Sequence, residues 1–225
     1  MTIGRSDESR KNILGRIRKA QGRAVRPSQA ELEAVDTYLN ARPRGPLASV
    51  DAALVTHFRA RAEAMQSTTE AVESMADVPA AIARYLQSQR VPATGCIWPS
   101  LFNRPDLDWT AAGIAVEPRA ARDEDRIGIS GAFAAIAETG TLMVLSGADT
   151  PSSVSLLPET HIAILPQSRI VSHMEAAWDL LRAECGHPPR AVNFISGPSR
   201  TGDIEQTIVI GAHGPSLVHI VIVRG

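Results

Sequence analysis

From Val91 onward, short apolar runs alternate with turn-forming residues, and this alternation limits the folds that the chain can adopt. Most of the runs are continuously apolar, as expected for strands that are covered on both faces. Helices are expected between them over residues 132–137, which are rich in alanine, and 173–184. The pattern predicts an α/β fold. The expected strands are residues 95–98, 113–116, 127–129, 141–145, 161–165, 191–195, 207–210 and 217–223.

The first part of the chain lacks this alternation and has helical periodicity instead. It predicts a helical extension over residues 1–75, followed by an α/β domain over residues 76–225. The first helix of the extension is basic and amphipathic, because its apolar residues share one face and arginine and lysine surround them. The expected helices of this part are residues 5–23, 30–40 and 48–66, and the next helix begins near residue 77.

Charge and cysteine content exclude several classes of protein. The net charge is −1, so nothing points to nucleic acid. No apolar run approaches the roughly 18 residues of a membrane span, and the first residues lack the apolar core of a secretory signal. Two cysteines in unrelated contexts, Cys96 and Cys185, fit a reducing, cytoplasmic location. They are too few for an iron–sulfur cluster, which usually needs about four thiolates, so we expect no cofactor bound by this chain.

A polar loop is expected over residues 197–205, between two core-forming segments. Two of its glycines have the spacing of a P-loop, but Asp203 stands where that motif has lysine, which excludes a Walker A site. Its backbone N–H groups and hydroxyls could instead hold an anionic or hydroxylated ligand. Alternatively, Asp203 caps a short helical turn with Gln206 as its partner, and both interpretations can hold together. The candidate ligand-binding residues of the loop are Gly197, Ser199, Thr201, Asp203 and Glu205.

Three further turns carry polar residues next to expected strands. One precedes the strand at 141–145, one leads into the strand at 161–165, and one follows the strand at 207–210. Each turn could bind a ligand, or its hydroxyls and histidine could satisfy their own backbone or face solvent. These turns add Glu138, Thr139, Gly140, Thr141, His161, His213 and Gly214 to the candidate residues.

Three segments in series resemble the LUD-domain proteins of lactate utilisation, specifically the short C-type, LutC-like subunit. They are AAIAETGTLMVLS, SLLPETHIAIL and ISGPSRTGDIEQTIVIGAHGP, and the resemblance covers about residues 91–225. It implies a three-layer α/β sandwich similar to the fold of ribose-5-phosphate isomerase and the CoA transferases, with the helical extension in front. By position, it implies a site lined by Glu138, Thr139, Gly140, Thr141, Ser199, Thr201, Asp203 and Glu205, with His213 and Gly214 nearby.

The resemblance also implies a function. It suggests a component of a cytosolic multi-protein system that oxidises lactate to pyruvate, with iron–sulfur proteins as partners that supply the clusters this chain lacks. It does not imply that this chain is the catalytic one. Two alternatives remain: a stand-alone enzyme of the isomerase and CoA-transferase fold acting on a sugar phosphate, a CoA ester or a nucleotide, and a module that assembles partners.

The chain departs from the family pattern at two places. Phe133 stands where members often have an acidic residue, and Ser152 to Val154 stand where members often have an arginine. Both changes are expected to remove charge from the rim of the site. Because ligands of open α/β sheets bind at the carboxyl ends of strands, we expect the polar turns to meet there, with Glu138 close to Asp203.

Overall fold

The computed structural model describes residues 3–50, 53–204 and 207–225, with the backbone alone at residues 3–5, 203 and 204. The chain forms two compact units, Met1–Pro46 and Leu47–Gly225. The second unit, called the body below, therefore begins before the predicted boundary at 75/76. The reason is that residues 68–72 form a strand of the main sheet, as their pairing with residues 219–223 shows.

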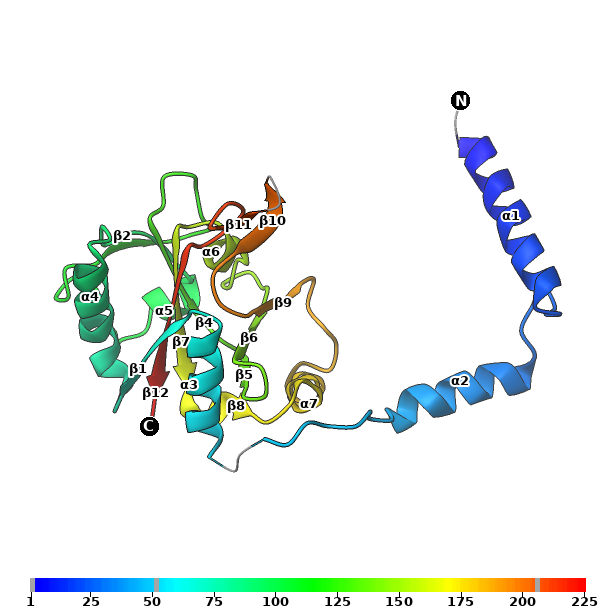
Figure 1. Ribbon diagram of the computed structural model, residues 1–225, viewed down its shortest axis with the longest axis horizontal. Coiled ribbons are helices and arrows are strands. Elements are labelled where there is room, and N and C mark those ends of the chain that lie inside the picture. The colour runs from blue at the N-terminus through cyan, green and yellow to red at the C-terminus, as the bar shows by residue number, and fades with distance from the viewer. Residues whose placement is uncertain (1–2, 51–52, 205–206) are drawn as a thin grey trace. The chain divides into compact units, whose positions relative to one another are not determined.

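A six-stranded parallel sheet forms the centre of the body (Figure 1). All neighbouring strands are parallel, so their amino ends share one edge of the sheet and their carboxyl ends share the other. The central strands are buried on both faces, which explains their continuous apolar runs. In sheet order the strands are β1 (Thr68–Val72), β12 (Leu217–Val223), β7 (Thr160–Pro166), β4 (Ile127–Gly131), β2 (Thr94–Ile97) and β3 (Ala115–Pro118).

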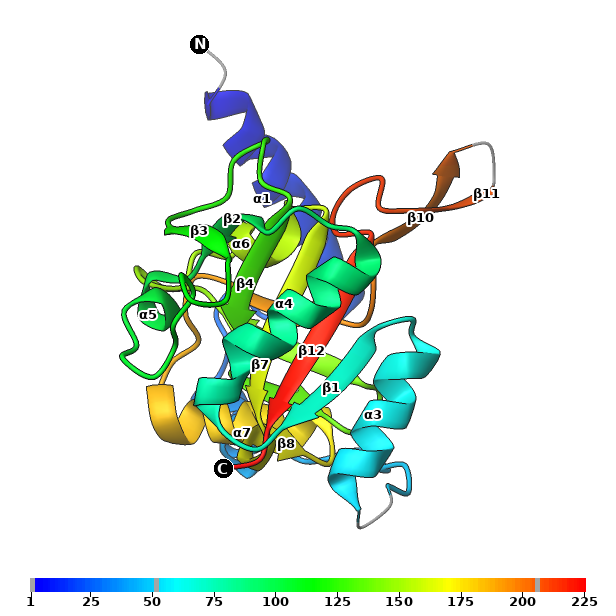
Figure 2. The same ribbon diagram turned by 90° about the vertical axis from the view of Figure 1, so that its left-hand side faces the viewer.

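Helix α4 (Val78–Gln89) covers one face of this sheet, across β12 and β7 (Figure 2). It follows the short helix η1 (Met75–Asp77), and the capping box between Ser74 and Asp77 fixes the start of this helical stretch. Ile82 and Leu86 of α4 are fully buried in a cluster with apolar residues of β4, β7 and β12. The short helix α5 (Pro99–Phe102) and the loop after it complete this layer.

Helix α3 (Leu54–Ala64) and a second, four-stranded sheet cover the other face (Figure 1). Phe58 of α3 is fully buried between the two sheets. Helix α7 (Met174–Cys185) covers the outer face of the second sheet with Ala177 and Leu181. This arrangement confirms the predicted three-layer α/β fold. The second sheet consists of β8 (Ile170–Val171), β5 (Ala134–Ile136), β6 (Thr141–Leu145) and β9 (Val192–Ile195), and α6 (Ser153–Leu156) and η2 (Gln167–Arg169) are connections.

Two segments of the body differ from their predicted secondary structure. The alanine-rich stretch at 132–137 contains strand β5 and no helix, because pairing with β6 and β8 overrides the helix propensity of alanine. The expected loop at 197–205 contains β10 (Arg200–Ile204), which pairs with β11 (Thr207–Ile210) in an antiparallel hairpin. The backbone of Asp203 is extended in β10, whereas its side chain and Gln206, its partner in the alternative capping interpretation, lie outside the described residues.

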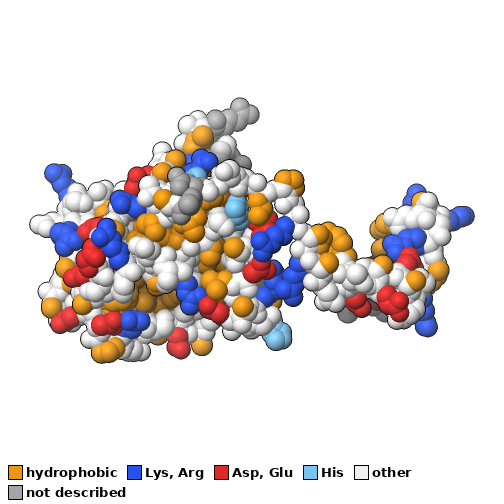
Figure 3. All heavy atoms as spheres, turned by 90° about the horizontal axis from the view of Figure 1, so that it is seen from below, with side chains coloured by type: hydrophobic (Ala, Val, Ile, Leu, Met, Phe, Trp, Pro, Cys, Tyr) orange, Lys and Arg blue, Asp and Glu red, His pale blue; other side chains and the backbone are white. Residues whose placement is uncertain are grey.

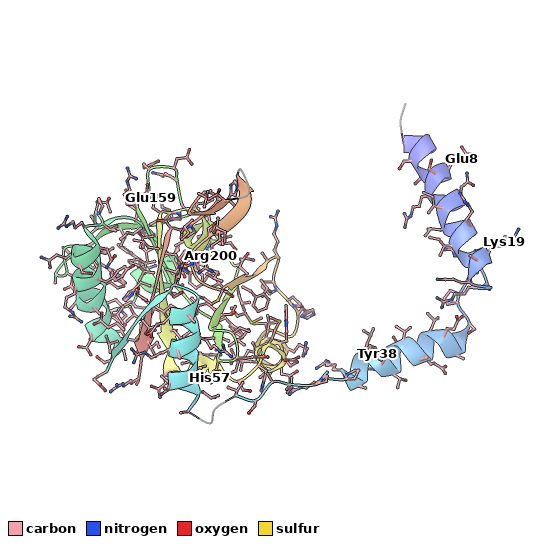
Figure 4. All side chains as sticks on the ribbon, in the orientation of Figure 1. Glu8, Lys19, Tyr38, His57, Glu159 and Arg200 are labelled. Carbon is pink, nitrogen blue, oxygen red and sulfur yellow. The ribbon has the colours of Figure 1, made fainter. Side chains whose placement is uncertain are left out.

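The N-terminal unit contains α1 (Ile3–Ala20) and α2 (Gln29–Ala41), which match the two helices predicted first. A capping box between Ser28 and Glu31 starts α2, and Arg23 bonds to Glu31 at 2.8 Å. Glu8, Lys19 and Tyr38 of this unit are labelled in Figure 4. Among the described helices, none is both long and apolar enough to cross a membrane.

Candidate functional site

The polar turns singled out in the sequence meet at the amino edge of the six-stranded sheet. The hydroxyls of Thr141 and Ser196 lie 2.7 Å apart, and the Ser199 amide donates to Pro215 O at 2.8 Å. The Ser216 amide donates to Glu159 O, also at 2.8 Å. These bonds join four segments of the chain into what we call the amino-edge cluster, which comprises residues 138–141, 156–161, 196–200 and 211–216.

Two glycines allow the cluster to pack against the last turn of α3. A Cβ atom on Gly140 would lie 2.3 Å from Ala62 N, and one on Gly197 would lie 2.0 Å from Met65 O. Both glycines also have positive φ, +69° and +79°. Any larger residue would therefore push one of these turns off α3.

Hydroxyl and guanidinium groups hold the turns together. Thr141 bonds at 2.7 Å to both Thr139 and Ser196, so the three hydroxyls form a chain. The Arg200 guanidinium donates to Met65 O at 2.6 Å and to the Gln66 side chain at 3.1 Å. The start of the hairpin is thereby tied to the end of α3.

A hollow of about 330 Å³ opens beside these turns. The backbone N–H groups of Ala212, His213 and Gly214 form no backbone–backbone hydrogen bond among the described residues, and Ala212 and His213 are exposed. N–H groups without a backbone partner are available to a ligand. Glu159, which forms an ion pair with Arg126, lies in the wall and is labelled in Figure 4 at the same end of the body as Arg200. The hollow is lined by Leu156, Leu157, Glu159, Gly211, Ala212, His213, Gly214 and Ser216.

His161 does not line this hollow and does not face solvent. It is fully buried within β7, with its Nε2 atom 2.8 Å from the Ser130 hydroxyl. Burial lowers its pKa to about 4, so the ring is neutral. His219 of β12 is similarly buried, stacks on Tyr85 at 3.8 Å between ring centroids, and has its pKa lowered by burial to about 4.

The remaining candidates lie in several places. Glu138, Thr139, Gly140, Thr141, Gly197 and Ser199 belong to the amino-edge cluster, and the Thr139 hydroxyl bonds to Thr141 within it. Glu138 is half-buried, and its amide donates to Ser172 O at 3.0 Å. Thr201 and the backbone of Asp203 lie in β10. The side chain of Asp203 and all of Glu205 lie outside the described residues. The expected approach of Glu138 to Asp203 therefore stays a prediction.

The polar turns do not lie at the carboxyl edge of the six-stranded sheet, where they were expected to meet. The turns at 156–160 and 211–216 lead into the amino ends of β7 and β12, at the edge opposite to the carboxyl ends. Residues 207–210, which were expected to be a strand of the α/β sheet, pair instead with residues 200–204 in a separate hairpin. Phe133 is also not at the rim: it packs on the outer side of the second sheet, where the Arg169 guanidinium lies 5.5 Å from its ring.

Sequence reasoning missed three residues of this edge. Ser196, Arg200 and Glu159 all lie in the quoted segments, but their roles depend on partners far along the chain. Only one feature of the sequence indicated the hollow, namely the Gly-Ala-His-Gly-Pro break after the strand at 207–210. Within the described residues, no three histidine, cysteine, aspartate or glutamate side chains are grouped as a metal ion would require.

The LUD domain family model matches residues 55–223, which is most of the chain and almost the whole body. The chain belongs to the LUD-domain family. Its relatives include lactate utilization protein C of Bacillus subtilis, which is 39% identical over 121 residues, covering 52% of this chain and 50% of that protein. The protein of the same name from Halalkalibacterium halodurans is 48% identical over 92 residues, 40% of each chain. The chain spans about half the length of the curated relatives it matches.

A solved structure has the same fold. The crystal structure of a DUF162 family protein from Deinococcus radiodurans superposes with a TM-score of 0.56 and covers 79% of this chain and 99% of that one. The two sequences are 23% identical, so this likeness concerns the fold. It agrees with the three-layer α/β arrangement described above.

Proposed function

We propose that this LUD-domain chain is a component of a lactate-utilisation system and binds a small hydroxy-carboxylate in the amino-edge hollow. The observation that carries the proposal is the hollow at residues 211–216, where the N–H groups of residues 212–214 form no described backbone hydrogen bond and where the second and third family segments meet. Such N–H groups suit a carboxylate, and the nearby hydroxyls suit a hydroxy acid. The relatives named lactate utilization protein C support lactate as that acid.

In this proposal the chain acts in the cytoplasm with iron–sulfur proteins. Oxidation of lactate to pyruvate removes two electrons and two protons, so an electron acceptor is required. The chain has two cysteines, of which Cys96 is buried and Cys185 is exposed. Clusters on partner proteins would take the electrons, and this chain would hold the substrate or the partners in place.

A charge introduced at Ala212 tests the hollow. Ala212 is exposed, so Ala212→Glu and Ala212→Gln should both fold. Only the glutamate would repel a bound carboxylate, and we expect it to weaken lactate binding at least about tenfold relative to the glutamine variant. Titration calorimetry with lactate, and with acetate as the acid that lacks the hydroxyl, measures this difference. Equal affinities of the two variants would contradict the proposed site.

Growth on lactate tests the role of the two carboxylates in the family segments. Asp203→Asn and Glu138→Gln should keep the wild-type melting temperature, because each change keeps the size and shape of the side chain and removes only its charge. We expect both to abolish growth when they replace the wild-type gene in a strain that depends on it for lactate. Wild-type growth rates for both variants would exclude these carboxylates from the function.

A further inference from the structure

A second, larger cavity lies at the opposite, carboxyl edge of the six-stranded sheet. Its volume is about 670 Å³, twice that of the amino-edge hollow. It lies where β4, β7 and β12 end, at Gly131, Pro166 and Val223. The carboxyl ends of parallel strands are where open α/β sheets bind their ligands. A site was expected at this edge from the sequence, but the residues predicted for it lie at the amino edge.

Small side chains keep this cavity open, and apolar ones line it. Gly131, Ala132 and Ala76 leave space that larger residues would fill. Met75 and Leu101 contribute apolar walls. Figure 3 looks onto this edge of the body and shows hydrophobic side chains across its middle, with arginine and acidic side chains around them. An apolar ligand body would therefore find a matching surface here.

The charged residues of the cavity leave one arginine for a ligand. Arg104 forms a bidentate pair with Asp106, at 2.9 and 2.6 Å, and both residues line the cavity, so their charges cancel there. Arg224 also lines the cavity, but its partner Glu73, at 2.6 Å, does not. Because the Arg224–Glu73 ion pair is exposed to solvent, it contributes little free energy, and the guanidinium remains able to donate hydrogen bonds to an anion.

Arg224 also lies at the junction of two hollows. A neighbouring space of about 540 Å³, lined in part by residues 53–56, shares Arg224 and Ser168 with the larger cavity. The Arg224 amide donates to Val72 O at 3.0 Å, which holds its backbone against the end of β1. The combined space is that of a drug-sized ligand and far exceeds the needs of a small hydroxy acid.

We propose that this carboxyl-edge cavity is a second binding site, for an amphipathic organic anion. The apolar body of the ligand lies between Met75, Leu101 and Ala132, and its anionic group binds Arg224 and the Ser168 hydroxyl. The anionic group is a phosphate or a carboxylate, which share this chemistry. The site is separate from the amino-edge hollow, so it does not depend on the function proposed there.

Two fluorescent probes with the same aromatic body test the site. Anilinonaphthalene sulfonate carries one negative charge, and N-phenyl-1-naphthylamine carries none. We expect the sulfonate to bind the folded protein at least about tenfold more tightly than the neutral probe, and Arg224→Gln to remove that preference. Arg84→Gln is the matched control, because Arg84 is an exposed arginine paired with Glu70 that lines neither hollow. Equal effects of the two variants would overturn the role of Arg224.

Filling the cavity tests its position. Ala76 is exposed at the wall, and Ala80 is exposed on α4 away from it, so both positions should tolerate phenylalanine. We expect Ala76→Phe to displace the sulfonate probe and Ala80→Phe to leave its affinity unchanged. Competition by adenosine monophosphate would identify phosphate as the anionic group, and competition by octanoate would identify carboxylate. Probe binding that neither compound reduces, or that Ala76→Phe leaves intact, would overturn the proposal. Ala212→Glu should have no effect on it.

Discussion

At Gly140 and Gly197 the backbone turns through positive φ while it touches the last turn of α3. Each condition alone favours glycine, and together they exclude a side chain. These two residues bring segments about sixty positions apart onto one surface, and the hydroxyls of Thr141 and Ser196 then meet at 2.7 Å. The geometry of the amino-edge cluster thus depends on the absence of a Cβ atom at these two positions.

Gly197→Ala should destabilise the protein by about 3 kcal/mol, because its Cβ combines left-handed strain with overlap at Met65 O. Gly202→Ala, five residues along, is the matched control, since nothing lies within 4 Å of its added Cβ. We expect the control to stay within about 0.5 kcal/mol of wild type. Urea unfolding measures both free energies. A small loss for Gly197→Ala would mean that the turn can separate from α3.

At the scale of elements, continuous apolar runs predicted strands and their bounds most reliably. Residues 141–145 and 217–223 are strands with the predicted bounds, because strands buried on both faces need apolar residues throughout. Strand β1 has the sequence Thr-Thr-Glu-Ala-Val and so has no such run. Strand β5 has the sequence Ala-Ala-Ile, in which the two alanines favour a helix, and pairing with two strands decides its conformation.

The position of the candidate site needed information that the sequence does not carry locally. The turns at 138–141, 197–199 and 213–214 were recognised as polar breaks, and they do lie together. Which edge of the sheet they occupy depends on the pairing of residues 207–210, which form a hairpin. The carboxyl-edge cavity could not be predicted from the sequence, because Arg104 and Arg224 are far apart along the chain. They line one cavity only because the strand order brings them to the same edge of the sheet.

The buried histidines of β7 and β12 predict an acid-sensitive sheet. In the unfolded chain His161 and His219 have the ordinary pKa of 6.5, whereas in the fold burial lowers it to about 4. Between these values the unfolded state binds protons that the folded state does not. Stability is therefore fully present above pH 6.5 and is lost as the pH falls towards 4. At pH 5 the loss is about 2 kcal/mol for each histidine.

This dependence is measured by urea unfolding at pH 7.5 and pH 5. His161→Gln should lower the stability at pH 7.5 but reduce the loss between the two pH values, because glutamine does not titrate. The double variant with His219→Gln should reduce that loss further. A loss as large in the double variant as in wild type would assign the acid sensitivity to other groups.

At the scale of the whole molecule, the body has a hollow at one edge of its six-stranded sheet and a larger cavity at the other, and the N-terminal unit adds a basic helix. His57, labelled in Figure 4, lies on α3 towards the carboxyl edge, away from Glu159 at the amino edge. Residues 1–30 hold eight lysine and arginine residues against two acidic ones. On α1, Ile13 and Ile17 are 58% and 46% exposed, so an apolar stripe runs beside the basic residues. Such a helix suits an acidic surface, for example on a partner subunit.

Deletion of residues 1–26 should therefore weaken association with the partners of the proposed lactate-utilisation system. The body should keep its melting temperature, because it forms a compact unit from Leu47 onward. The difference between the full chain and the deletion variant should be large at low ionic strength and shrink as added salt screens the charges. A full-length variant with Arg16, Arg18 and Lys19 changed to glutamine removes positive charge and keeps the length of the chain. If charge is what matters, this variant should associate as weakly as the deletion variant. Size-exclusion chromatography of mixtures measures the association at about 50 mM and about 500 mM salt, because the Debye length is several times longer in water of low ionic strength than at high salt. Unchanged association of both variants at low salt would show that α1 has no part in it.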